Sequence, residues 1–288
     1  MKKIIFLFFF SQTLFAQIQN DLLLKDLQFL ASAPLEGRKV GTEGNLKARI
    51  FIQKRFTDLK LFYFQNDYLQ YFEYDKKKAA NVVAYLKGTQ NPESYIVISA
   101  HYDHLGKDGK KIFFGADDNA SGTAALLAFA AYFSENPPKK SIIFLATDAE
   151  EVGLKGAYHF VKNSPVPLDR IFANINMDMI SRNDDKELVA CGTYFYPKLK
   201  NYFLDTQKYG IKLVFGHDDP KLYVGSNNWT KASDHAAFHE KEIPFIYFGV
   251  ADHADYHRPT DSFENIHPDF YKKTCWYILD FIKKLDAE

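Results

Sequence analysis

Ile142-Ile143-Phe144-Leu145-Ala146-Thr147-Asp148-Ala149-Glu150-Glu151 joins an apolar run to a pair of adjacent glutamates. The apolar run predicts a buried strand that ends at Thr147, and the glutamates then fall in the loop that follows it. Neighbouring loop residues can point in different directions, so Glu151 could bind a metal ion while Glu150 faces an attacking water. Acidic pairs are also common in solvated loops, so this segment alone does not establish a site.

Further residues of the metal-binding type follow other predicted strands or open a predicted helix. His101 and Asp103 follow the predicted strand Ser94–Ala100, and Asp178 follows the predicted strand Ile171–Met177. The segment Gly115–Gly122 opens the small-residue helix Thr123–Phe133. Tyr256 and His257 lie in the loop after the predicted strand Pro244–Gly249. In open α/β sheets, ligands gather outside the carboxyl ends of the strands. We therefore expect these loops to converge on one crevice.

The order of the predicted elements indicates one α/β domain. Two helices, Asn20–Ala31 and Gly44–Leu59, precede alternating strand-like and helix-like runs, and a helix over Pro268–Leu285 ends the chain. Such alternation favours a largely parallel sheet with helices on both faces. Phe62–Tyr74 and Asn81–Lys87 are expected to pair antiparallel at one edge, because the link between them is too short for a parallel crossover.

Taken in order, these motifs resemble the two-zinc aminopeptidases of secreted bacterial type. Relatives of that family include the glutamate carboxypeptidase ectodomain and the animal-type glutaminyl cyclases. The resemblance runs from about Pro34 to the C-terminus and rests on His101 with Asp103, GADDNASG at Gly115–Gly122, AEEVGL at Ala149–Leu154, Asp178, and Tyr256 with His257. It implies a three-layer α/β/α sandwich around a mixed, mostly parallel sheet.

The resemblance also implies a ligand set, matched residue by residue. Asp118 would bridge two zinc ions, because the family's bridging carboxylate directly precedes the position that Asn119 fills here. The same matching gives the first ion His101 and Asp178, gives the second ion Glu151 and His257, and makes Glu150 the general base. Imidazole nitrogens and carboxylate oxygens are typical zinc ligands, and a catalytic ion keeps a position open for water or substrate.

Three further residues have supporting roles in this interpretation. Asp103 is expected to hydrogen-bond the second ring nitrogen of His101 and so fix its tautomer. Tyr256 is assigned a hydrogen bond to the developing oxyanion, as in some similar aminopeptidases. Asp234 lies in Ser233-Asp234-His235, which is typical of a helix N-cap, and a supporting role at the metal centre is the alternative.

Other polar residues have simpler interpretations. His104 is expected to form a structural hydrogen bond in its loop. Asp117 and Asp148 fit helix-end or loop carboxylates better than ligands. The remaining histidines without ligand context are expected on the surface or in packing: His217, His239, His253 and His267. Cys191 and Cys275 are expected to be two separate buried thiols, although export would permit a disulfide.

The N-terminus predicts export. Lys2 and Lys3 precede the short apolar run Ile4–Phe10, and cleavage after Ala16 would remove residues 1–16 as a signal peptide and leave one catalytic domain, 17–288. The apolar run is shorter than the ~20 residues that span a bilayer, so no membrane anchor is expected after cleavage. The protein is then expected in the periplasm or outside the cell. A formal net charge of zero argues against general attraction to nucleic acid.

The sequence therefore predicts an exported zinc-dependent aminopeptidase with two zinc ions per chain and peptides as substrates. One alternative is a glutaminyl cyclase, which has a similar fold and ligand set but typically works with one zinc. A second alternative is a non-catalytic binding module on the same scaffold. The segment Glu150–Ala157 favours the peptidases over the cyclases, and the complete ligand set argues against a binding module.

Overall fold

The computed structural model describes the backbone of residues 11–288 and the side chains from Asn20 onward. Residues 1–10 of the predicted signal peptide lie outside the described residues, and for residues 11–16 only the backbone is described. None of the described helices is both long enough and apolar enough to cross a membrane.

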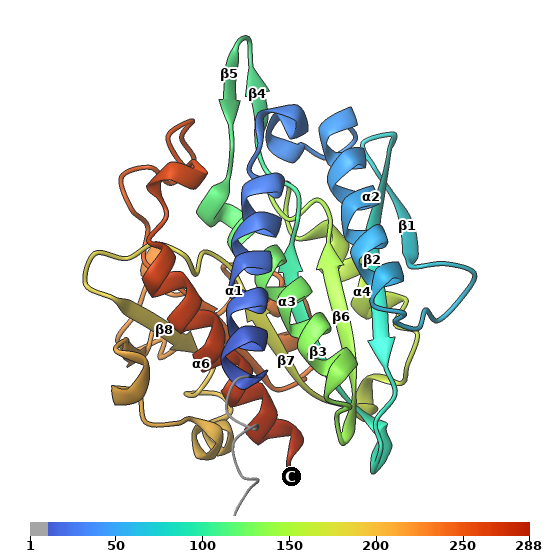
Figure 1. The fold of residues 1–288 in the computed structure, drawn as a ribbon, viewed down its shortest axis with the longest axis vertical. Helices are drawn as coiled ribbons and strands as arrows, with labels where there is room; N and C mark the ends of the chain where they lie inside the picture. The colour runs from blue at the N-terminus through green and yellow to red at the C-terminus, as the bar shows by residue number, and fades with distance from the viewer. Residues whose placement is uncertain (1–10) are drawn as a thin grey trace, which may run out of the picture.

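An eight-stranded mixed sheet forms the centre of the molecule (Figure 1). Its strand order is β1-β2-β6-β3-β7-β10-β8-β9. Strands β6, β3, β7 and β10 run parallel to one another, whereas β1, β2 and β8 introduce antiparallel pairs. The bounds are β1 Leu69–Tyr74, β2 Lys77–Leu86, β3 Asn91–His101, β6 Lys140–Thr147, β7 Ile171–Met177, β8 Glu187–Cys191, β9 Lys212–Phe215 and β10 Phe245–Gly249.

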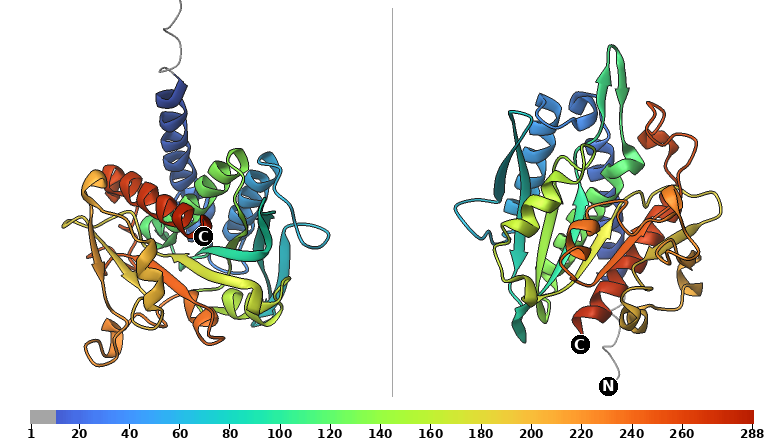
Figure 2. Two further views of the ribbon diagram at one scale, coloured as in Figure 1. Left: turned by 90° about the horizontal axis from the view of Figure 1, so that it is seen from below. Right: turned by 180° about the vertical axis from the view of Figure 1, so that it is seen from behind.

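Helices cover both faces of this sheet (Figure 2). One face carries α1 Ser11–Leu30, α2 Glu43–Asp58, α3 Gly122–Glu135 and α6 Pro268–Asp286, and the other carries α4 Lys155–Lys162 and α5 His235–His239. The predicted three-layer α/β/α sandwich is thus confirmed. A small hairpin of β4 Gly106–Asp108 and β5 Lys111–Phe113 projects beyond the layers (Figure 1).

The two cores explain why the central strands have continuous apolar runs. In β6, Ile142 and Phe144 pack into the core beneath α1, α2, α3 and α6, while Ile143 and Leu145 pack into the core beneath α4 and α5. A strand with helices on both faces buries every side chain, so its sequence shows no alternation. This is the pattern from which the strand was predicted.

The predicted antiparallel edge is present, with shifted bounds. Strand β1 begins at Leu69, and the earlier Phe62 makes only an isolated bridge to Tyr85. Only Asp75 and Lys76 connect β1 to β2, and both have positive φ angles.

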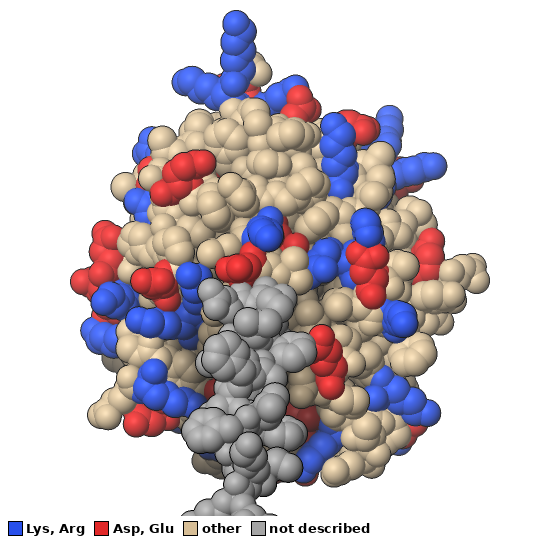
Figure 3. Space-filling view, in the orientation of Figure 1, with Lys and Arg blue, Asp and Glu red and all other residues tan. Residues whose placement is uncertain are grey.

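The final helix, the two cysteines and the surface charges agree with the sequence analysis. The predicted final helix is present, and its buried residues include Tyr271, Thr274, Ile278, Phe281, Ile282 and Leu285. Cys191 and Cys275 are buried free thiols, as predicted. Basic and acidic side chains are interspersed over the face shown in Figure 3.

Candidate metal centre

The predicted ligand residues lie at the carboxyl ends of the parallel strands. His101 is the last residue of β3, Asp178 follows β7 directly, and Glu151 lies in the loop after β6. Asp118 belongs to the turn Ala116–Ser121 that leads into α3, and His257 lies in the loop after β10. Because β6, β3, β7 and β10 are parallel neighbours, their carboxyl ends meet at one edge of the sheet.

A first group of ligand atoms surrounds His101. Its Nε2 lies 3.2 Å from Oδ1 of Asp178 and 3.4 Å from Oδ1 of Asp118. All three residues are buried. Two ligands bound to one zinc ion at 2.0–2.2 Å in tetrahedral geometry lie about 3.4 Å apart, so this spacing suits a shared ion.

A second group surrounds His257. Its Nε2 lies 3.1 Å from Oδ2 of Asp118 and 3.4 Å from Oε2 of Glu151. Asp118 therefore presents one carboxylate oxygen to each group. This arrangement suits a carboxylate that bridges two ions.

The protonation of this centre follows from the same contacts. Burial works against the charged form of His257, but hydrogen bonds with Asp118 and Glu151 raise its pKa to about 10. Burial also works against ionised Asp118, but hydrogen bonds from His101 and His257 hold its pKa well below its usual value. The carboxylate that faces both groups is therefore ionised, which is the form that binds metal.

His104 lies closer to the second group than sequence reasoning indicates. Its Nδ1 is 2.7 Å from Oε1 of Glu151 and 3.7 Å from Oδ2 of Asp118. Its buried Nε2 has no hydrogen-bond partner among the described residues. His104 thus holds Glu151 in place, as the predicted structural hydrogen bond requires, and one ligand-type atom from each of His104, Asp118 and Glu151 lies within 4.8 Å of the other two.

Glu150 is placed beside the first group. A carboxylate oxygen of Glu150 and ligand atoms of His101 and Asp178 all lie within 4.8 Å of one another. Burial raises the pKa of Glu150 well above its usual value; His101 opposes this shift, and the neighbouring carboxylate of Asp178 adds to it. A carboxyl group with a raised pKa beside a metal position is suited to accepting and returning a proton.

Asp103 contacts this region differently from the prediction. The Nδ1 atom of His101 is 3.2 Å from the backbone carbonyl of Asp103 and 3.7 Å from its carboxylate. The carboxylate instead accepts hydrogen bonds from the backbone N–H groups of Glu150 at 3.0 Å and Glu151 at 3.4 Å. Asp103 thereby orients the two glutamates, while its main chain provides the acceptor for the His101 ring.

The N-cap interpretation of Asp234 is correct for its backbone position but not for its side chain. Asp234 occupies the cap position of α5, but its side chain makes no cap hydrogen bond. Its Oδ2 accepts from the Thr147 hydroxyl at the end of β6, and its buried Oδ1 has no partner among the residues described. Burial raises the pKa of Asp234 to about 6. This position beneath the glutamate loop agrees with the alternative of a supporting role.

Asp261 supports the turn that carries Asp118. Its two carboxylate oxygens accept from the backbone N–H groups of Asp117 at 2.9 Å and Asp118 at 3.1 Å. The Asp118–Asn119 peptide bond is cis, and Asn119 donates through Nδ2 to the carbonyl of Met177. The sequence contained no signal for Asp261, because its partners lie more than 140 positions earlier in the chain.

The two other acidic residues considered in the sequence are not in the ligand groups. Asp117 accepts from the backbone and hydroxyl of Ser181 and contacts His253 at 3.1 Å. Asp148 accepts from the side chain of Asn45 and from the backbone of Ala80. Both carboxylates hold loops, as expected.

Tyr256 follows β10 in the chain, and the loop Gly216–Trp229 follows β9. The Tyr256 ring stacks on His257 with centroids 3.8 Å apart, and burial raises its pKa, so the hydroxyl keeps its proton. Trp229 contacts Tyr247, whose hydroxyl donates to the carbonyl of Asp178 at 3.3 Å. The loop therefore packs on the strand that flanks the first group of ligands.

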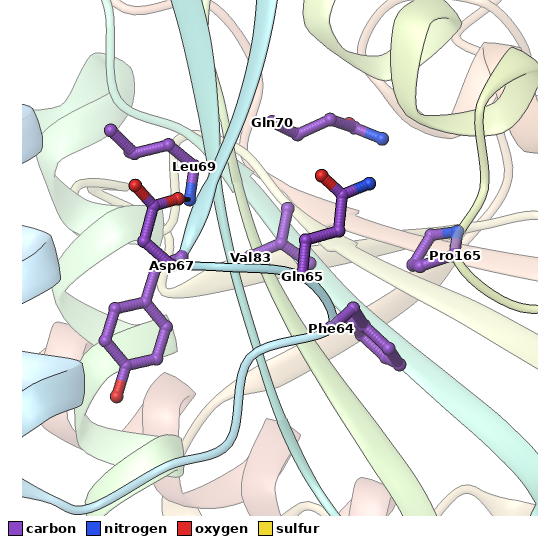
Figure 4. A pocket seen from close by; sticks show the side chains of 8 residues that line it. Phe64, Gln65, Asp67, Leu69, Gln70, Val83 and Pro165 are labelled. Carbon is purple, nitrogen blue, oxygen red and sulfur yellow. Dashed lines mark hydrogen bonds between the residues drawn. The ribbon is translucent and has the colours of Figure 1, made fainter.

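A separate small hollow of about 20 Å³ beside β1 contains none of these residues (Figure 4). It is lined by Phe64, Gln65, Asp67, Tyr68, Leu69, Gln70, Val83 and Pro165. Its single carboxylate, that of Asp67, accepts from the backbone of Leu69. This hollow offers no second candidate for a metal centre.

Comparison with known proteins gives consistent matches. The model of Peptidase family M28 matches residues 81–282. Aminopeptidase YwaD of Bacillus subtilis is 32% identical over 189 residues, which span 62% of this chain and 38% of that protein. The chain thus covers well under two thirds of this curated relative.

Two solved structures from Bacteroides thetaiotaomicron share the fold. A leucine aminopeptidase precursor superposes with a TM-score of 0.73 at 18% identity, covering 92% of this chain and 96% of that one. A glutaminyl cyclase bound to N-acetylhistamine gives a TM-score of 0.73 at 18% identity, with coverages of 92% and 97%. At this level of identity the likeness shows the fold alone.

Proposed function

Because this chain belongs to peptidase family M28, we propose that it is an exported zinc-dependent aminopeptidase that removes N-terminal residues from peptides. The observation that carries the proposal is the position of Asp118, with Oδ1 3.4 Å from His101 and Oδ2 3.1 Å from His257. Two complete groups on either side of one carboxylate support a two-ion centre. A centre that uses one ion does not need the second group.

The residues present fit zinc in chemical type and spacing. His101, Asp118 and Asp178 would hold one ion, and Asp118, Glu151 and His257 would hold the other. Three protein ligands per ion leave a coordination position for water or substrate. When bound, zinc polarises a peptide carbonyl and lowers the pKa of a coordinated water to about 7.

The proton transfers are assigned to Glu150. Its carboxylate accepts the proton of the attacking water and then delivers that proton to the departing amine. Its raised pKa, which burial causes, suits both steps. Asp103 holds the Glu150 backbone, and Asp234 lies close enough to Glu150 to raise its pKa further. The Tyr256 hydroxyl, which keeps its proton, is assigned the hydrogen bond to the oxyanion.

The proposal is tested by zinc content per chain, measured together with two reactions. These are amino-acid release from a panel of aminoacyl substrates and cyclisation of a peptide with N-terminal glutamine. Two zinc ions with amino-acid release support the aminopeptidase. One zinc ion with cyclisation would instead identify a glutaminyl cyclase, and neither zinc nor turnover would leave a binding module.

Export is proposed from the N-terminal sequence alone. Lys2, Lys3 and the apolar run Ile4–Phe10 have the pattern of a signal peptide with cleavage after Ala16. Expression in a bacterium with a secretion pathway, followed by N-terminal sequencing, should give a mature chain that starts at Gln17. Recovery of the uncleaved chain from the cytoplasm alone would contradict export while leaving the metal centre unaffected.

A further inference from the structure

Arg38 is a buried charged residue that the proposed mechanism does not use. It ends the short segment Ala33–Arg38 between α1 and α2, and its side chain is fully buried. The guanidinium makes four hydrogen bonds, all to backbone carbonyls. They are Nε to Tyr102 at 2.8 Å, Nη1 to Leu30 at 2.5 Å and to Phe114 at 2.7 Å, and Nη2 to Gly115 at 2.9 Å.

Three of these four carbonyl partners belong to the segments that carry the proposed metal ligands, and the fourth, Leu30, ends α1. Tyr102 directly follows His101, and Phe114 and Gly115 lie shortly before Asp118. The backbone carbonyl of Arg38 in turn accepts from the N–H of His104 at 3.4 Å. One side chain therefore joins the loop after β3 to the turn before α3.

The charge of Arg38 is also unusually placed. Buried charged groups are normally paired with an opposite charge, yet no ion pair of Arg38 is present in the described part of the chain. Burial lowers its pKa to about 10, against the attraction of Asp118, Asp261 and Asp103, so Arg38 stays charged at neutral pH. The positive charge of Arg38 is thus attracted by carboxylates in and around the metal centre, although Arg38 makes no hydrogen bond to any of them.

The backbone at Arg38 adopts a conformation that side chains disfavour. Glu36, Gly37 and Arg38 have φ angles of 46°, 70° and 52°. A Cβ atom on Gly37 would lie 2.3 Å from the carbonyl oxygen of Gly106 and 2.4 Å from that of Phe113. Two non-glycine residues in the left-handed region cost free energy, and such conformations persist where surrounding contacts hold them. Here those contacts are the hydrogen bonds of Arg38.

We infer that Arg38 is a positioning residue for the metal centre, which sets the spacing of His101 and Asp118 by binding carbonyls on both of their segments. The inference rests on the proposed zinc centre. A planar guanidinium can bond several carbonyls in fixed directions, whereas a lysine ammonium has the same charge on a single atom and cannot span them. Substitution by lysine therefore separates the role of the hydrogen bonds from that of the charge.

The experiment compares Arg38→Lys with the matched control Arg55→Lys. Arg55 lies in α2 and donates to Asp26 of α1 at 3.1 Å, and among the described residues its side chain makes no hydrogen bond to either ligand segment. Zinc affinity is measured by competition with a chromophoric chelator, and the melting temperature is measured with and without zinc. Arg38→Lys should weaken zinc binding by about 10–100-fold, the usual cost of losing a group that orients ligands. Arg55→Lys should lower the melting temperature without changing zinc affinity.

Each result bears on the inference. Zinc affinity of Arg38→Lys equal to that of the wild type, or equal weakening in both variants, would overturn it. A wild-type protein that binds no zinc would instead overturn the proposed function. If Arg38→Lys does not fold, Arg38→Gln is measured in the same way. Folding of either variant only when zinc is present supports the inference, and failure of both to fold with zinc would make Arg38 a general structural residue and refute it.

Discussion

A buried neutral histidine should make the protein lose stability in mild acid. The His235 ring is fully buried at the start of α5, between Phe245 and Tyr247. Its Nε2 lies 2.8 Å from the carbonyl of Trp229, so Nε2 carries the proton of the neutral ring. Its Nδ1 has no partner among the described residues. Burial lowers the pKa of His235 from 6.5 to about 3.

The sign of the effect follows from this shift. The unfolded chain binds a proton at His235 below about pH 6.5, whereas the folded protein resists it down to about pH 3. The contribution of neutral His235 to the free energy of unfolding is therefore fully present above about pH 6.5 and is lost as the pH falls from 6.5 toward 3. Each pH unit below 6.5 costs about 1.4 kcal/mol, so the loss reaches about 2 kcal/mol near pH 5.

The assay is urea unfolding of metal-free wild type and His235→Gln at about pH 7.5 and about pH 5. Glutamine keeps an N–H donor for Trp229 but does not titrate. The wild type should lose about 2 kcal/mol more than the variant between these two conditions. Equal losses in the two proteins would refute the claim that His235 is held neutral by burial.

The remaining predictions concern the base and the thiols. Glu150→Gln should keep the zinc content and lower kcat by about 10²–10⁴-fold because the proton acceptor is lost; activity within a few-fold of wild type would exclude Glu150 as the base. The comparison variant Glu151→Gln should instead lower zinc occupancy, because Glu151 faces His257 at 3.4 Å. Cys191 and Cys275 are buried with raised pKa values, so neither should react with a thiol reagent until the chain unfolds; rapid labelling of the native protein would contradict their burial.

The sequence predicted the fold and the gathering of ligands because both depend on local patterns. Apolar runs such as Ile142–Leu145 mark strands buried on both faces, and the residues after parallel strands meet at one edge. The family resemblance then distinguished Asp118 from Asp117. The structure places Asp117 against Ser181 and His253, away from the ligand groups.

Arg38 and Asp261, which sequence reasoning missed, act through distant backbone contacts. Arg38 bonds carbonyls 64, 76 and 77 positions later, and Asp261 binds N–H groups 143 and 144 positions earlier. Backbone acceptors and donors occur at every position, so no side-chain pattern marks them. For Asp234, the helix-start sequence predicted the backbone position but not the side-chain partner, which is the hydroxyl of Thr147.

The most direct test of the two-ion centre is the zinc content of Asp118→Asn beside that of Asp117→Asn. In Asp118, one oxygen faces each group of ligands, at 3.4 Å from His101 and 3.1 Å from His257. An amide replaces one of these oxygens by an N–H₂ donor, which cannot bind a metal ion. We predict two zinc ions per chain in the wild type and in Asp117→Asn, and at most one in Asp118→Asn. Two ions retained in Asp118→Asn would contradict the bridging role of Asp118.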